Sequence, residues 1–206
     1  MRHVGRANVA KRLRPLAGSP GRTLYGGGQA RFELEELTLT VVPPFGLEHE
    51  GAYDALRVEP LLEALERDVT VAVVLVRMGG FAVGVLEGER VAVSKVGTRF
   101  VKNRHKKGGS SSNRFRRRRG EQERGLVDAA AAEAVRVLGP WEGRVDAVAL
   151  GGDRSAVTRV LEARPELGWL APLALERFFD VPEPRRRVLE ALPYQLYAAR
   201  VVEEPR

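Results

Sequence analysis

Three apolar segments in close succession, residues 69–77, 81–87 and 90–97, constrain the fold of this chain more than any other feature. Each is rich in valine, whose branched side chain favours strands. Only the short sequences "MGG" and "EGE" separate the segments, and connections of this length are typical of hairpins. The pattern therefore predicts an antiparallel meander of three strands.

After the meander, the chain alternates between helix and strand patterns. A long helix is predicted from about 112 to 138, where Leu126, Ala130, Ala134 and Val137 share one face. Residues 144–152 are typical of a buried strand, and Asp153 is placed to cap a helix that runs to about 163. This order predicts an α/β fold with a mixed β-sheet, an antiparallel meander followed by strand–helix units, packed by helices.

The remaining elements are assigned from shorter patterns. Residues 173–181 and 194–202 are predicted strands, and residues 183–192 are a predicted helix with Pro184 near its start. Together with the elements above they form one predicted domain over 68–206, with a loop at 98–112.

The first 67 residues are predicted to form a small N-terminal extension. Residues 1–30 are basic and rich in glycine and proline, which is typical of a mobile arm. Residues 31–42 alternate apolar and polar side chains and predict a strand, and leucine spacing predicts a short helix over 56–67. We therefore expect a mobile arm at 1–30 and an α/β extension at 31–67.

Positive charge is concentrated in two segments. Residues 1–22 carry six Lys or Arg and residues 99–119 carry ten, with no acid in either segment. The rest of the chain carries 18 bases against all 27 acids, although the whole protein has a net charge of +7. Focused positive charge on an acidic body indicates a polyanionic partner.

The chain lacks the residues that several kinds of catalytic or metal site require. The chain has no cysteine, which excludes disulfides and thiolate catalysis, and its three histidines lie far apart in sequence. No phosphate-binding glycine loop occurs, so we expect neither a metal nor a cofactor. The most apolar stretch, residues 69–76, is too short to span a membrane, and no signal peptide is evident. We therefore expect a soluble cytoplasmic protein.

The basic segment 105–119 combines flexible backbone with concentrated charge. Gly108 and Gly109 lack a Cβ atom, so the chain here can approach a partner closely. Serines and Asn113 add short polar groups, and five arginines follow within 114–119. Such a segment becomes favourable against phosphates, because each contact releases counterions. The alternative is a basic loop with incidental RNA affinity.

These residues resemble those of a known family. The loop is similar to "KKHGRGGQSALRFARLR" of the eukaryotic/archaeal-type class I peptide release factors, with Lys106-Lys107, Gly108-Gly109 and Arg114-Phe115 in the same order. A Vms-like release-factor branch of actinobacteria is more similar still. This chain has "GGFAVGVLEG", "SKVGTRFV", "GGSSSNRFRRRR" and "FFDVPEPR" where that branch has related motifs. The resemblance covers about 69–203 and implies an RNase H-like release-factor central domain.

The resemblance implies hydrolysis of the ester that joins a peptide to tRNA. The partners would be peptidyl-tRNA and the peptidyl-transferase centre of the large ribosomal subunit. The protein would act on stalled ribosomes or on large subunits that carry peptidyl-tRNA, because no codon-reading domain is evident. We expect a monomer. The implied catalytic residues are Gly108, Gly109, Ser110, Ser112 and Asn113. The implied RNA-binding residues are Lys102, Arg104, His105, Lys106, Lys107, Arg114, Arg116, Arg117, Arg118 and Arg119.

The loop departs from the family at one position. The family's glutamine is absent, and its place falls on Ser110 in one register or on Ser112 and Asn113 in the other. A literal "GGQ" at 27–29 lies outside the matched region, and we interpret it as a coincidence. Three activities stay open: ester hydrolysis, binding of tRNA or ribosomes without hydrolysis, and cleavage near the tRNA 3′ end.

Overall fold

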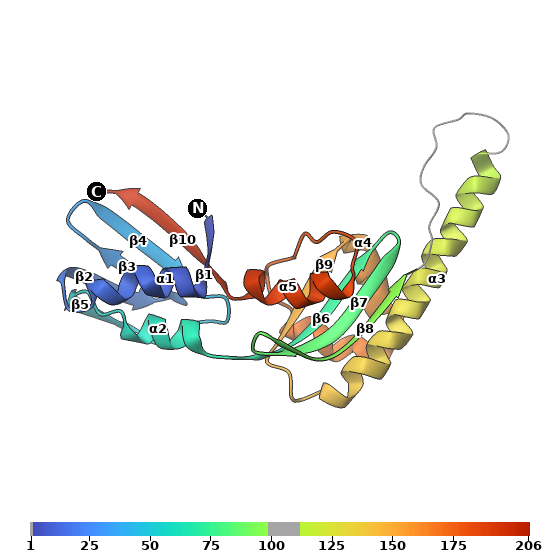
Figure 1. Ribbon diagram of the computed structural model, residues 1–206, viewed down its shortest axis with the longest axis horizontal. Coiled ribbons are helices and arrows are strands. Elements are labelled where there is room, and N and C mark those ends of the chain that lie inside the picture. Colours follow the sequence, from blue (N-terminus) through green and yellow to red (C-terminus); the bar gives the residue numbers. More distant parts are fainter. Residues whose placement is uncertain (1, 99–111) are drawn as a thin grey trace. The chain divides into compact units, whose positions relative to one another are not determined.

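The computed structural model describes residues 2–98 and 112–206, and over 112–119 it describes the backbone alone. The chain forms two compact units, one of Met1–Asp68 with Tyr194–Arg206 and one of Val69–Pro193 (Figure 1). Each unit is built around its own sheet, which confirms a mixed α/β protein. Within the described residues, no helix is long and apolar enough to cross a membrane.

The second unit contains the predicted meander. Strands β6 (Thr70–Arg77), β7 (Gly80–Glu87) and β8 (Arg90–Thr98) pair antiparallel in sequence order. Strand β9 (Ala147–Gly152) pairs parallel with β6, so the sheet order is β8-β7-β6-β9. The meander, the mixed sheet and the strand within 144–152 are therefore confirmed.

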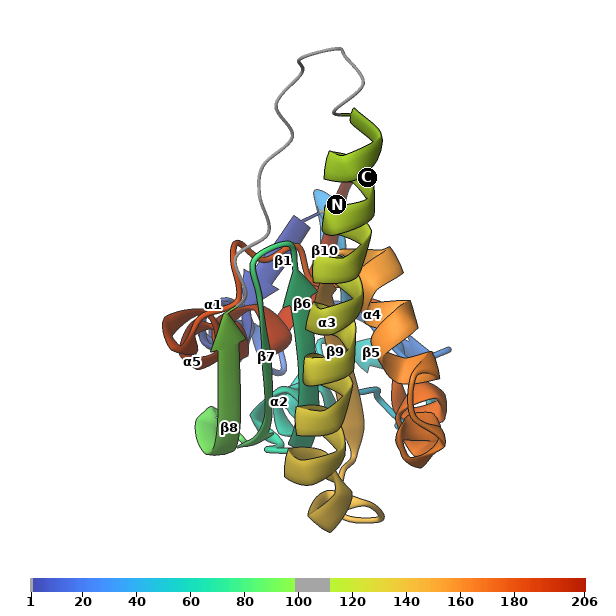
Figure 2. The ribbon, with the colours of Figure 1, turned by 90° about the vertical axis from the view of Figure 1, so that its right-hand side faces the viewer.

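Helices cover this sheet on both faces. Helices α3 (Ser112–Leu138) and α4 (Arg154–Glu162) share one apolar core with the strands (Figure 2). Two 3-10 helices, η2 (Gly139–Trp141) and η3 (Pro165–Leu173), follow α3 and α4. Helix α5 (Arg186–Leu196) covers the opposite face. Its Leu189 lies so close to Gly84 that a Cβ atom on Gly84 would be 3.2 Å from the Leu189 side chain. The predicted helices at 112–138 and after Asp153 are confirmed.

The first unit is a six-stranded antiparallel sheet with helices α1 (Arg6–Leu13) and α2 (Glu59–Glu66) in its core. The sheet order is β1-β10-β4-β3-β2-β5. The strands are β1 (Arg2–Gly5), β2 (Pro20–Gly26), β3 (Gln29–Glu33), β4 (Leu37–Val42), β5 (Gly51–Ala55) and β10 (Ala198–Pro205). A 3-10 helix, η1 (Arg14–Leu16), follows α1.

The expectation of a mobile arm at 1–30 is wrong, because these residues form β1, α1, β2 and the start of β3. Val9 and Leu13 of α1 are buried against the sheet, with exposed fractions of 4% and 0%. Charge and glycine content suggested disorder, whereas the apolar positions of α1 form part of a core whose strands come from later in the sequence. Strand β1 pairs with β10, from the far end of the chain.

Three further expectations differ from the structure. The segment 31–42 is two strands, with a turn in which the Leu34 N–H bonds to the carbonyl of Leu37. Residues 173–181 form no strand and make only isolated parallel bridges from Ala174 and Phe179 to β9. The last predicted strand, at 194–202, begins only at Ala198, because α5 continues to Leu196, and as β10 it joins the first unit's sheet instead of the domain predicted at 68–206.

The literal "GGQ" at 27–29 is part of a hairpin. Gly27 and Gly28 connect β2 to β3 and have φ angles of +60° and +74°. Two successive residues with positive φ are required by the type I′ turn, and glycine adopts them at least cost. Hairpin geometry accounts for both glycines.

Candidate nucleic-acid interface

One edge of the four-stranded sheet gathers the segments that the sequence marks as functional. Strands β6, β8 and β9 run in the same direction, so their carboxyl ends meet at this edge. Helix α3 starts beyond the edge and runs back along the sheet, and β9 begins only after α3 has ended (Figure 2). The loop predicted at 98–112 falls on residues 99–111, which lie outside the described residues, between the end of β8 at Thr98 and the start of α3 at Ser112.

The two halves of α3 have different surroundings. From Leu126 onward its apolar face is buried, with Leu126, Ala130 and Ala134 in the core. Residues 120–125 are exposed or half-buried. At 1.5 Å per residue, Ser112 lies about 21 Å along the axis from Leu126. The first turns extend past the strand ends, as Figure 2 shows, so the core does not account for this part of the helix.

The charge of these first turns is unfavourable for an isolated helix. Five arginines lie within 114–119, and the first turn of α3 contains no acid. The amino end of a helix already carries a partial positive charge, so a cation in the first turn, here Arg114, destabilises the helix by about 0.3–1 kcal/mol at low salt, and like charges three or four residues apart add about 0.2–0.5 kcal/mol per pair. Repulsion of this kind is expected at an anion-binding site, because a bound anion would neutralise the positive charge at the helix end.

The structure locates only part of the predicted site. The residues Gly108, Gly109, Ser110, Lys102, Arg104, His105, Lys106 and Lys107 lie outside the described residues. Ser112, Asn113, Arg114 and the arginines at 116–119 lie in the first turns of α3, where the backbone is described. The helix thus presents the two polar candidates and the arginine run consecutively, at the end that follows the loop.

Close packing holds the end of β8 in place. A Cβ atom on Gly97 would lie 2.4 Å from the ring of Phe81, and one on Gly80 would lie 2.8 Å from the Gly97 carbonyl oxygen. Neither position can accept a side chain without movement of its neighbour. The strand that precedes the loop therefore ends in a position set by the core.

The two aspartates at the ends of β9 have structural roles. Asp146 accepts a hydrogen bond from the Thr70 N–H at 2.7 Å. Asp153 caps α4 by accepting the Ala156 N–H at 3.0 Å, and it also accepts the Ser155 hydroxyl at 2.9 Å. These hydrogen bonds, the backbone one first, lower the pKa of Asp153 below its usual value. The sequence predicts Asp153 as a helix cap, and this role explains why its carboxylate is ionised and hydrogen-bonded at the start of α4.

The other basic segment, at residues 1–22, is compensated within its own unit. Glu203 pairs with Arg2 at 2.6 Å and with Arg12 at 2.5 Å, and these two hydrogen bonds, Arg12 first, lower the pKa of Glu203. Arg6 pairs with Asp68 at 3.0 Å and Arg14 with Glu66 at 2.5 Å.

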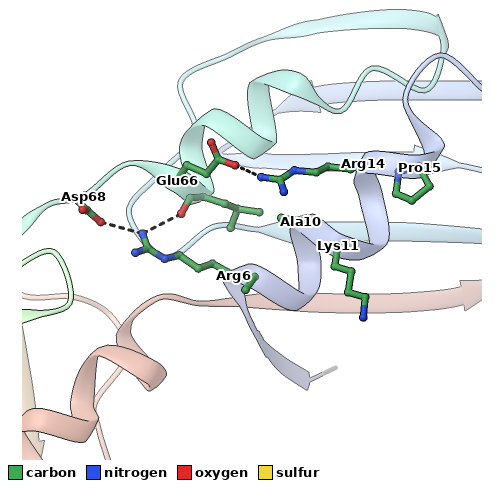
Figure 3. Close-up of a pocket in the computed structure, with 9 residues that line it drawn as sticks. Arg6, Ala10, Lys11, Arg14, Pro15, Glu66 and Asp68 are labelled. Atoms are coloured by element: carbon green, nitrogen blue, oxygen red, sulfur yellow. Dashed lines mark hydrogen bonds and ion pairs between the residues drawn. The ribbon is translucent and has the colours of Figure 1, made fainter.

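Arg6 and Arg14 line the walls of a shallow hollow of about 520 Å³ between α1 and α2 (Figure 3). Four of the six bases in the N-terminal segment are thus paired with acids of α2, the segment after it, and β10. The sequence indicated a polyanionic partner for both segments, but only the segment 99–119 still supports that prediction.

One feature at the same sheet edge was missed from the sequence. Arg154 starts α4 directly after β9, and its guanidinium carbon lies 4.2 Å from the centre of the Phe178 ring. Arg77, at the end of β6, bonds to Asp180 at 3.2 Å and to the Val181 carbonyl. The sequence did place Arg154 just after a predicted strand. Because side chains at the carboxyl ends of parallel strands lie close together, this position could have included Arg154 in the candidate site.

Comparison with known proteins identifies the second unit. A family model described as the Actinobacteria/chloroflexi VLRF1 release factor matches residues 69–202. Among solved structures, the archaeal translation termination factor aRF1 is 18% identical, with a TM-score of 0.46 over 78% of this chain and 49% of its own. A second, titled "Archaeal protein", is 17% identical, with a TM-score of 0.42 over 78% of this chain and 50% of its own. This chain thus spans about half the length of either, and no curated protein matches it.

Proposed function

The chain belongs to the Actinobacteria/chloroflexi VLRF1 release factor family, and on this premise we propose that it releases peptides from peptidyl-tRNA on stalled ribosomes or large subunits. The reaction is hydrolysis of the ester between the peptide and the tRNA 3′ end. The segment 105–119 carries the activity, and the second unit is an RNase H-like central domain that supports it. The protein acts as a cytoplasmic monomer.

The observation that supports this proposal most directly is the construction of α3. Its second half is anchored in the core from Leu126 onward, and its first turns extend past the sheet with five arginines. A rigid basic projection suits the ribosome, whose RNA offers phosphates on every side. Arg114 and the arginines at 116–119 bind that backbone, and Lys102, Arg104, His105, Lys106 and Lys107 extend the same contact.

The chemistry asked of the protein is modest. Ester hydrolysis needs a positioned water molecule and hydrogen-bond donors for the oxyanion that develops on the carbonyl. Backbone N–H groups at Gly108 and Gly109 supply donors, with the hydroxyls of Ser110 and Ser112 beside them. Asn113 orients the water or a ribose hydroxyl through its amide. No metal or cofactor takes part in the proposed reaction.

The missing glutamine favours one second candidate. With Ser110, Ser112 and Asn113 at the positions where the family carries its amide, the chain could bind tRNA or ribosomes without hydrolysing the ester. The Asn113 side chain is one methylene shorter than glutamine, a loss of about 1.5 Å in reach. The two candidates share the arginine contacts and differ only in what the loop does to the ester.

Stalled ribosome–peptidyl-tRNA complexes distinguish the candidates. Purified protein is added, and both the released peptide and the length of the tRNA are measured. Release of peptide with intact deacylated tRNA supports hydrolysis. Shortened tRNA would identify a nuclease instead, and binding with neither product would identify a non-catalytic factor.

Two substitutions test the assigned residues within the same assay. Gly109→Ala restricts the loop backbone and should lower the release rate while thermal stability stays constant. Gly168→Ala is its matched control, because Gly168 is exposed and a Cβ atom there meets nothing within 4 Å. Asn113→Ala should lower the rate by about 10²-fold with ribosome affinity unchanged, as expected for one positioning group, and Asn113→Gln should keep or raise it. Full activity in Asn113→Ala would remove that residue from the mechanism.

A further inference from the structure

Arg154 and Phe178 form a cation–π pair at the sheet edge where α3 begins. Arg154 is the first residue of α4, and its guanidinium carbon lies 4.2 Å from the centre of the Phe178 ring. Phe178 is half-buried against the core, whereas Arg154 is exposed. The guanidinium therefore lies over an anchored ring, and because the Arg154 side chain is exposed it is accessible to another planar group.

The charge of Arg154 is not used within the described part of the chain, where it makes no ion pair. Its neighbour Asp153 directs its carboxylate at the Ala156 N–H and the Ser155 hydroxyl. Because Arg154 stands at the amino end of α4, the helix does not stabilise its charge either. The contact with the Phe178 ring orients the side chain, so less of its conformational freedom is lost when a ligand binds.

The pair lies beside the helix that carries the arginine run. Helices α3 and α4 pack against the same face of the sheet and both begin at its carboxyl edge. They are linked side by side by Glu123 of α3 and Arg159 of α4, whose charged atoms lie 3.9 Å apart. The start of α4 is therefore within the reach of an RNA that is held on the first turns of α3.

We propose that Arg154, supported by Phe178, is a stacking site for an unpaired nucleotide at the 3′ end of tRNA. This inference rests on the proposed function, and it specifies which part of the substrate the second unit recognises. Unpaired bases bind proteins by stacking on aromatic rings and on the planes of arginine guanidinium groups. A guanidinium that already lies on a ring offers such a plane, and its charge adds attraction to the nearby phosphates.

The chain contains a matched control for this site. Arg144 lies over the ring of Trp141 with its guanidinium carbon 4.5 Å from the ring centre, and it is also exposed. That pair lies between the end of α3 and the start of β9, at the opposite edge of the sheet. The two pairs have the same chemistry and differ in their distance from the start of α3.

The test measures the affinity of the full chain for two RNAs, a deacylated tRNA and the same tRNA with its unpaired 3′ nucleotides removed. Arg154→Ala should weaken binding of the intact tRNA roughly tenfold, the size expected for one stacked base, and leave binding of the trimmed tRNA unchanged. Arg154→Lys keeps the charge without the plane and should lose most of the same affinity. Arg144→Ala should change neither.

Three results would overturn the proposal. Equal loss on both RNAs, or full rescue by lysine, would mean that Arg154 contacts phosphate. An effect of Arg144→Ala equal to that of Arg154→Ala would mean that the contact is not specific to this edge. No effect of Arg154→Ala on intact tRNA would remove the residue from RNA binding.

These outcomes are separable from failure of the proposed function. If the natural protein releases no peptide but shows the tail-dependent loss in Arg154→Ala, the stacking site stands and the hydrolase assignment falls. If it releases peptide and Arg154→Ala binds both RNAs normally, the stacking site falls and the proposed function stands.

Discussion

Replacement of Arg116, Arg117, Arg118 and Arg119 by alanine should separate binding from folding. These positions lie at least seven residues before Leu126, which is the first buried residue of α3 from position 120 onward. Alanine is the best helix former, and the substitutions remove like-charge pairs three or four residues apart, each of which destabilises the helix by about 0.2–0.5 kcal/mol. The free energy of unfolding should therefore stay constant or rise by about 1 kcal/mol, as measured by urea denaturation at low salt.

Binding should respond in the opposite direction. If each arginine contacts one phosphate, loss of four contacts lowers the slope of log affinity against log salt by about 3–4. Between 50 mM and 200 mM salt, the affinity of the variant for tRNA should thus fall by roughly 100-fold less than that of the natural protein. Fluorescence anisotropy at a series of salt concentrations measures both slopes.

A control with the same change of charge shows whether position matters. The control replaces four exposed arginines outside the first turns of α3 by alanine: Arg90, Arg136, Arg144 and Arg164. Its salt slope should stay close to that of the natural protein. An unchanged slope in the variant of 116–119, or an equal fall in the control, would refute the view that this part of α3 holds RNA.

Other predictions concern the elements around the site. Gly152→Ala should destabilise the second unit by about 3 kcal/mol in thermal unfolding, since a Cβ atom would lie 2.1 Å from the Val76 carbonyl oxygen at a φ of +99°. Asp153→Ala should cost about 1 kcal/mol at neutral pH through loss of the α4 cap. Because the folded pKa of Asp153 is lowered, this difference should be complete above about pH 5 and vanish as pH falls through the folded pKa, which urea unfolding at several pH values would show. Gln29→Ala should leave peptide release unchanged, and a loss of release would contradict its assignment to a hairpin.

The sequence by itself determined the elements whose signals are local. The meander at 69–97 was evident because valine-rich runs and short glycine connections specify strands and hairpins within a few residues. Helix α3 was evident from its apolar spacing, and the cap at Asp153 from a polar side chain placed just before an apolar period. The concentration of arginine at 114–119 likewise needs no structure to be seen, and motif spacing sufficed to identify the family.

Tertiary structure decided whatever depends on partners distant in sequence. Strand β10 was expected to close the second domain, but it lies between β1 and β4 in the first unit. The segment at 1–30 is ordered because β1 pairs with β10 and because Glu203 holds Arg2 and Arg12. Neither effect is visible locally, since hydrogen-bond partners and opposing charges arrive from residues nearly 200 positions away. Arg154 was missed for the same reason. Its contact with Phe178 and its position near α3 exist only once the carboxyl ends of the strands lie at one edge of the sheet.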